Sequence, residues 1–148
     1  MNRVRRPLRI LIAAVLCLAV AGSAIAATAP YKSGDYKGKT GQRNPSAGKK
    51  FSLTFTIAKG KISKVRTITR DKCPDGTFLR VTQNAFKPAK LDAKGRFTLV
   101  AGTTQQPAVM KGKVSGSTAS GTITDRTNDP NNSGPCKAST TWSATLVK

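Results

Sequence analysis

Hydrophobic and polar residues alternate along most of this chain with a period of two. The clearest case is Lys50–Ala58, where Ser and Thr separate four apolar residues, Phe51, Leu53, Phe55 and Ile57. A period of two over this length predicts a strand with one buried face. Gly60 then supplies the positive φ of a tight turn, and Ile62–Thr69 returns as the partner strand. The apolar residues of this second strand break the period, which predicts a β-bulge near Ser63–Val65.

Further segments of this kind follow, separated by turns rich in Gly, Pro, Asn and Asp. The expected strands are 77–82, 96–101, 108–115, 119–125 and 137–147. Asn84–Leu91 gives no clear prediction, because Pro88 disfavours a central strand there. Residues 27–48 are expected to form a flexible basic arm with a possible first strand at Tyr36–Thr40. About seven to eight antiparallel strands predict one all-β domain over residues 49–148, either a β-barrel or a β-sandwich.

The first 26 residues have the three parts of a secretory signal peptide. Four Arg residues lie near the start, Ile10–Val20 is a continuous apolar run, and Ala24–Ala26 is a small-x-small cleavage box. The apolar run is too short to cross a bilayer, which needs about 20 residues. We therefore expect residues 1–26 to be removed and the mature chain to be secreted, with no transmembrane segment and with a possible association with the cell surface.

Cys73 and Cys136 are the two cysteines that would remain, because Cys17 lies within the predicted signal peptide. A lone pair of cysteines in an oxidising compartment predicts a disulfide. Closing a loop of about 64 residues stabilises a fold by roughly 3 to 4 kcal/mol in the loop-entropy description. A redox role would favour adjacent thiols or a C-x-x-C motif, so a structural bridge is the preferred interpretation.

The absence of histidine and glutamate excludes several kinds of chemistry. Without histidine there is no Ser-His or Cys-His base and no imidazole metal site, and we expect no cofactor and no metal. Asp71 and Asp75 flank Cys73 and could form the carboxylate pair of a glycoside hydrolase, but Asp75 in Pro-Asp-Gly is explained as a turn residue. The expected protein is not an enzyme. A small hydrolase, or an enzyme inhibitor with an exposed loop at Asp71–Gly76, is the second alternative.

Two other features have simple structural explanations. The loop Asp129–Gly134 partly fits the start of a calcium loop, but the bidentate Glu that should follow is missing, so an Asx-rich turn is expected. Three Thr-x-Thr pairs are expected on the solvated sides of strands, where threonine is common: Thr54/Thr56, Thr67/Thr69 and Thr122/Thr124.

The net charge of +20 is the strongest functional signal. Removing residues 1–26 takes away four of the 26 basic residues and none of the six acids, which leaves +16. Such a field attracts anionic polymers such as wall polymers and anionic polysaccharides. Specific binding of nucleic acid is not expected, because no recognition motif is present. A lysine surface that only solubilises the protein is an equally weighted alternative. The candidate anion-binding residues are Lys49, Lys50, Lys59, Lys61, Lys64, Arg66, Lys111 and Lys113.

A carrier for a small ligand is the first alternative function. A barrel interior can form a pocket. The side chains expected to line it are Tyr36, Phe55, Phe78, Phe97 and Trp142.

Several short segments resemble a group of small secreted all-β proteins that are common in actinobacteria. The matching segments are Gly34–Thr40, Phe51–Phe55, the region of Cys73, Gly112–Ile123, and Cys136 with Trp142–Ala144. The resemblance covers nearly all of the mature chain and implies an all-β fold with one disulfide. Between Cys136 and Trp142 this chain has Lys and Thr where the group more often has Gly. The group has no assigned activity, so the resemblance implies no functional residues.

Overall fold

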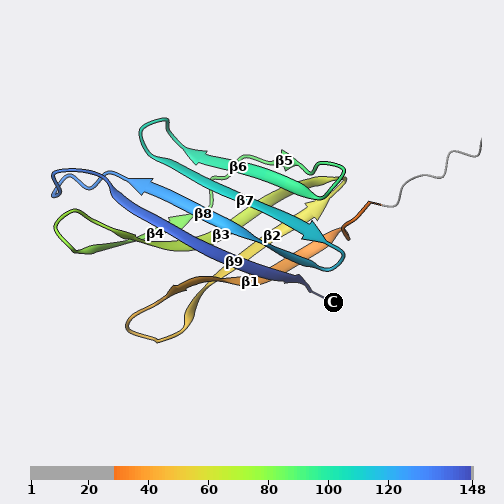
Figure 1. Cartoon of the computed structure of the whole chain (residues 1–148), viewed down its shortest axis with the longest axis horizontal. Helices are drawn as coiled ribbons and strands as arrows, with labels where there is room; N and C mark the ends of the chain where they lie inside the picture. Colours follow the sequence, from red (N-terminus) through yellow and green to blue (C-terminus); the bar gives the residue numbers. More distant parts are fainter. Residues whose placement is uncertain (1–28, 148) are drawn as a thin grey trace, which may run out of the picture.

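The computed structural model describes residues 29–147, which contain nine strands and no helix (Figure 1). The signal peptide predicted at residues 1–26 lies outside the described residues, in which no helix is long and apolar enough to cross a membrane. The strands are β1 (Gly34–Arg43), β2 (Lys50–Ala58), β3 (Lys61–Lys72), β4 (Phe78–Gln83), β5 (Ala89–Lys90), β6 (Arg96–Gly102), β7 (Pro107–Ser115), β8 (Thr118–Thr127) and β9 (Cys136–Leu146). The all-β prediction is confirmed.

Two antiparallel meanders make up the sheet. One contains β1 to β4 and the other β6 to β9, and the pairing of β1 with β9 joins them in the order β4-β3-β2-β1-β9-β8-β7-β6. An additional pairing of β3 with β9 closes β1, β2, β3 and β9 into a small four-stranded barrel. The other strands extend from this barrel, and the two-residue β5 pairs with β3. Of the two architectures predicted from the sequence, the structure therefore has the barrel.

The hairpin of β2 and β3 agrees with the prediction in detail. Phe51, Leu53, Phe55 and Ile57 are buried on one face of β2. Lys59 and Gly60 both have positive φ, at 49° and 70°, as a two-residue turn of type I′ requires. The register shifts between Thr54 and Thr56, opposite Lys64, which also has a positive φ of 53°. The bulge expected near Ser63–Val65 is thus present.

β1 is longer and more central than the sequence indicated. It runs over ten residues and pairs with β2 on one side and β9 on the other, within the segment expected to be an arm. Its inward side chains include Tyr36 and Thr40, with Gly38 between them. A glycine and a threonine at inward positions give little hydrophobic contrast, so the period of two is hard to recognise.

An aromatic chain links the barrel to the rest of the sheet. Tyr36 stacks on Phe55 with ring centroids 4.9 Å apart. Phe55 meets Trp142 edge to face at 5.9 Å, and Trp142 lies 6.0 Å from Phe97 on β6. Aromatic pairs at these distances add favourable quadrupole contacts to the burial of apolar area. The apolar part of the core is therefore continuous from β1 to β6.

Two glycines on β7 and β8 allow close packing beside Trp142. Phe97, Gly112, Gly121 and Trp142 lie in one cross-strand row from β6 to β9. A Cβ atom on Gly112 would lie 2.4 Å from the Trp142 ring, and one on Gly121 would lie 1.9 Å from the carbonyl oxygen of Lys111. Both contacts are closer than van der Waals radii allow. Gly112 therefore leaves space for the Trp142 ring over β7, and Gly121 lets the backbones of β7 and β8 approach closely.

A disulfide covalently closes the barrel. β3 and β9 pair at Lys72 and Lys137, and the next residues in register are Cys73 and Cys136. Their sulfur atoms form the predicted disulfide, with Cα atoms 4.0 Å apart. Both cysteines are buried. The bridge thus connects the two strands where they have only one backbone pair in register.

Candidate functional site

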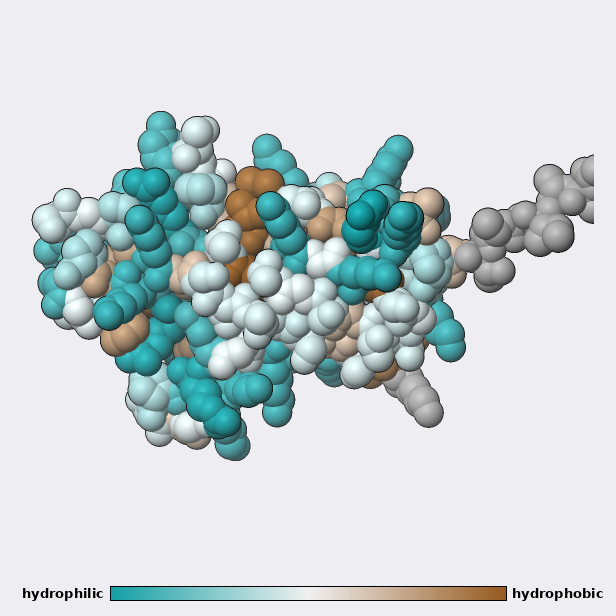
Figure 2. Space-filling model, viewed as in Figure 1, coloured by the Kyte–Doolittle hydropathy of each residue, from teal (hydrophilic) through white to brown (hydrophobic). Residues whose placement is uncertain are grey.

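A groove on the outer face of β1, β8 and β9 is the main candidate for a binding site. Its volume is ≈580 Å³. Three exposed lysines contribute to its wall, namely Lys37, Lys39 and Lys50, and no acidic residue does. The exposed hydroxyl side chains in the lining are Thr118, Ser120, Thr141, Ser143 and Thr145. In Figure 2 this face has a pale, weakly polar centre with strongly hydrophilic side chains projecting around it.

A second hollow lies farther along the same face, over β6, β7 and β8. Its volume is ≈690 Å³, and its basic lining residues are Lys90, Arg96, Lys111 and Lys113. Asp92 also lines it, but its carboxylate accepts hydrogen bonds from the backbone amides of Lys94 and Arg96 and from the Arg96 guanidinium. These donors hold the pKa of Asp92 below its usual range. This acid therefore offsets Arg96 and leaves the lysines of the hollow without a counter-charge.

One cross-strand row connects the two hollows. Successive register pairs place Arg96, Lys113, Ser120, Ser143, Lys39 and Ser52 side by side from β6 to β2. We call this set the basic row. Neighbouring strands are about 4.8 Å apart, so the Cα atoms of Lys113 and Lys39 are separated by roughly 14 Å. The row therefore presents cations at intervals along a line of hydroxyl groups.

The cations of this face are largely free of acidic partners. Among residues 29–147, Arg96 is the only Lys or Arg that forms an ion pair, with Asp92 at 2.7 Å. Two of the six aspartates, Asp71 and Asp125, are buried and do not offset the surface charge. The positive field predicted from composition is thus concentrated on exposed side chains.

The candidate cations chosen from the sequence are spread over several places. Lys111 and Lys113 line the second hollow, and Lys50 lines the groove. Lys64 and Arg66 line a third, smaller hollow of ≈420 Å³ beside Thr54. The remaining candidates, Lys49, Lys59 and Lys61, are exposed in or beside the two connections that flank β2.

The sequence analysis missed the basic residues of β1, which complete the groove. Lys37 and Lys39 alternate with Tyr36, Gly38 and Thr40, and this alternation was the available signal. This alternation predicts only a short strand within the expected arm, and it does not show that the lysines lie on the surface of the barrel.

The aromatic residues proposed as a ligand pocket do not all come together. Tyr36, Phe55, Phe97 and Trp142 pack on one another in the core. Phe78 is 48% exposed at the start of β4, where the Arg70 guanidinium lies 3.6 Å from its ring centroid. Phe78 thus belongs to a surface cation–π pair.

The end of the interior near the disulfide is polar. Its buried polar residues are Thr40, Thr67, Thr69, Asp71, Asp125 and Thr140. The expectation that Thr67 and Thr69 lie on a solvated side is wrong. The bulge at Lys64 shifts the alternation of β3, so that its inward residues after Val65 are Thr67, Thr69 and Asp71.

Two carboxylates, those of Asp71 and Asp125, are buried in this polar interior. Asp125 accepts hydrogen bonds from the Thr69 hydroxyl at 2.8 Å and the Gln83 amide at 2.6 Å. Asp71 is fully buried, and neither of its oxygens accepts a hydrogen bond from a group in residues 29–147. Burial, and then the negative charge of Asp125, raise the pKa of Asp71 to about 6. The hydroxyls of Thr69 and Thr127 oppose this increase in part, although neither bonds to Asp71 with good geometry.

The two acids beside Cys73 do not form a pair. Asp71 faces the interior, whereas Asp75 is exposed in the turn and accepts hydrogen bonds from the amide and hydroxyl of Thr77. These bonds lower the pKa of Asp75. The turn role expected for Asp75 is confirmed, and the carboxylate near Asp71 belongs to Asp125 on β8.

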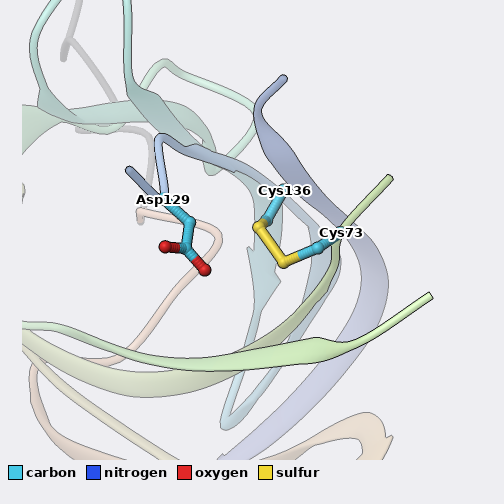
Figure 3. Close-up of side chains that lie close together, drawn as sticks. All are labelled: Cys73, Asp129 and Cys136. Atoms are coloured by element: carbon cyan, nitrogen blue, oxygen red, sulfur yellow. A yellow bond between two sulfur atoms is a disulfide. The ribbon is translucent and has the colours of Figure 1, made fainter. Parts of the chain in front are cut away.

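Asp129 lies beside the disulfide (Figure 3). One oxygen of its carboxylate and the sulfur atoms of Cys73 and Cys136 all lie within 4.8 Å of one another. Cys73 and Cys136 are bonded to each other, so their thiolates are not free to bind a metal. The carboxylate accepts hydrogen bonds from the amides of Asn131 and Asn132, at 3.0 to 3.1 Å. The loop is therefore the Asx turn that the sequence predicted.

Comparisons with known proteins identify no family. No protein-family model matches the chain, and neither a curated protein nor a solved structure matches it significantly. The chain is a small all-β protein with one disulfide.

Proposed function

We propose that this protein is a secreted, non-enzymatic binding domain that engages an anionic polymer of the cell envelope or its surroundings. The observation that carries the proposal is the groove lined by Lys37, Lys39 and Lys50 and by five exposed hydroxyl side chains, with no acid in its wall. Secretion is part of the proposal because the disulfide of Cys73 and Cys136 requires oxidising conditions to persist. The signal-peptide pattern and the resemblance to small secreted actinobacterial proteins support the same location.

Binding would combine long-range attraction with short-range hydrogen bonds. The unpaired lysines attract phosphate, sulfate or carboxylate groups, and salt screens this attraction over about 8 Å at physiological ionic strength. The hydroxyls of Ser120, Thr141 and Ser143 can donate hydrogen bonds to oxygens of a chain lying in the groove. Continuity of the basic row into the second hollow favours an extended ligand over a single small anion.

A matched pair of variants tests this function. The groove variant carries Lys37→Gln, Lys39→Gln and Lys50→Gln. The control variant carries the same substitutions at Lys87, Lys94 and Lys137, which are exposed and do not line the groove. Both variants have the same net charge, so a difference between them reports position and not total charge.

The measurement is retention on heparin and on immobilised polyphosphate across a salt gradient. A lysine near an anionic surface contributes about 1 kcal/mol, so we expect the groove variant to bind at least about tenfold more weakly than the control near physiological salt. Equal elution of the two variants would show that the groove is not the site. Elution of the unaltered protein at or below physiological salt would reject polymer binding altogether.

A further inference from the structure

We propose that Asp71 and Asp125 form a binding site for a divalent cation, and that the ion is Ca²⁺. The two acids come from β3 and β8, both are buried in the polar interior, and the charge of Asp125 acts on Asp71. This inference is independent of the polymer-binding function, because the groove and the two acids share no residue.

The decisive observation is the isolation of Asp71. Its side chain is fully buried, and both carboxylate oxygens lack a hydrogen-bond partner among residues 29–147. Buried carboxylates in proteins are normally paired with a cation or coordinate a metal. The Thr69 hydroxyl, which lies close to Asp71, donates to Asp125 instead, as does the Gln83 amide. The free oxygens of Asp71 are thus left as available ligands.

The surrounding donors are the kind that Ca²⁺ prefers. Calcium takes six to eight oxygen ligands from carboxylates, carbonyls and hydroxyl or water oxygens. The hydroxyls of Thr69 and Thr127 lie close to Asp71, and the Thr69 hydroxyl donates to Asp125. Gln83 donates through its nitrogen, so its carbonyl oxygen is not used in that bond. With no imidazole or free thiolate in the set, zinc and copper are poorer matches.

The lysines and arginines of the surface do not neutralise the two buried acids. The charged group that acts most closely on Asp71 is the carboxylate of Asp125, and not a Lys or Arg. Arg70, Lys72 and Arg126 alternate along their strands with the two acids, so their side chains lie on the opposite, outer face. A cation between the acids would therefore offset two negative charges that no protein group offsets.

The test is calcium binding by the purified protein, stripped of metal with a chelator. At about pH 8, where Asp71 is ionised, we expect millimolar Ca²⁺ to raise the melting temperature and calorimetry to show one ion per chain.

Two variants show whether the acids are the ligands. Asp71→Asn should weaken Ca²⁺ binding at least about tenfold. Asp125→Asn should also weaken Ca²⁺ binding, and its amide oxygen remains an acceptor for Thr69 and Gln83. This second variant tests the site if Asp71→Asn does not fold. Asp35→Asn is the matched control, because Asp35 is exposed and its acceptor role toward Thr56 is retained.

The results can overturn the inference clearly. An absence of both heat and thermal shift with Ca²⁺ in the unaltered protein at about pH 8 would show that the two acids do not bind the ion. An equal response in Asp71→Asn and the unaltered protein would place the ion elsewhere.

Discussion

Replacing Asp71 by Asn should stabilise the protein at neutral pH when divalent cations are chelated. Burial raises the pKa of Asp71 from its ordinary value of 3.8 to about 6. One pKa unit corresponds to about 1.4 kcal/mol, so the ionised carboxylate destabilises the folded state by about 3 kcal/mol. Asn has nearly the same shape, carries no charge, and can donate a hydrogen bond to Asp125. Burying the amide cancels about 1 to 2 kcal/mol of this, which leaves a net gain of roughly 1 to 2 kcal/mol.

The direction of the pH dependence follows from the raised pKa. Well below pH 3.8, Asp71 is protonated in both the folded and the unfolded state. At such a pH, Asp71 therefore does not lower the folding stability of the unaltered protein. As pH rises from about 4 to above 6, the unfolded state releases this proton more readily, and folding stability falls. Asp75 and Asp92 have lowered pKa values and act in the opposite direction, gaining stability as pH rises. Both residues are present in the two proteins, so their effects cancel in the difference.

The assay is urea unfolding followed by the fluorescence of Trp142, the single tryptophan, which is buried. The free energies of unfolding of Asp71→Asn and the unaltered protein are compared at several pH values. Their difference should increase in favour of the variant between about pH 4 and pH 7 and then stay constant. A difference that does not change with pH would refute the reasoning, as would a variant that is less stable at about pH 8. Asp35→Asn should show no such change.

Two further predictions concern the covalent and steric features of the barrel. Cys73→Ser should lower the free energy of unfolding by about 4 kcal/mol, because the bridge to Cys136 is lost. A thiol assay of the unaltered protein without its signal peptide should find no reactive thiol. Gly121→Ala should cost at least about 1 to 3 kcal/mol in urea unfolding, because the new Cβ meets backbone at 1.9 Å. Gly76→Ala, in a turn with open space around the Cβ, should cost less, about 1 kcal/mol for its φ of 87°; equal losses at the two glycines would contradict the close-packing explanation.

The parts of the fold that the sequence predicted well are those where side-chain contrast is strong. In β2, bulky apolar residues alternate with Ser and Thr, and the buried face follows directly. In β1, by contrast, an inward Gly38 and Thr40 carry no such contrast, and pairing with two neighbours provides the stability. The period alone could not show that this segment lies at the centre of the sheet, because strand order is a long-range property.

The polar interior could not be predicted from the sequence for a related reason. A bulge at Lys64 changes which residues of β3 face inward, and a bulge can be expected from a broken period without knowing on which side the pattern resumes. If the alternation at the start of β3 continued through the bulge, Thr69 and Asp71 would face solvent. Of the lysines at the candidate site, Lys50, Lys111 and Lys113 were predicted from the sequence. The groove itself could not be predicted, because it forms where β1 pairs with β9, and these strands are distant in the sequence.

The arrangement of two meanders has a consequence for how the chain acquires its structure. Within each meander, successive strands are hairpins, whose contacts are close in sequence and form quickly. β9 alone must find partners near the other end of the chain, in β1 and at the end of β3, and this search carries the largest loop-closure entropy. The docking of β9 should therefore limit the folding rate. If the disulfide forms before this docking, it links Cys73 to Cys136 while β9 is not yet paired with β1. If it forms afterwards, the two cysteines already lie opposite each other in the native register.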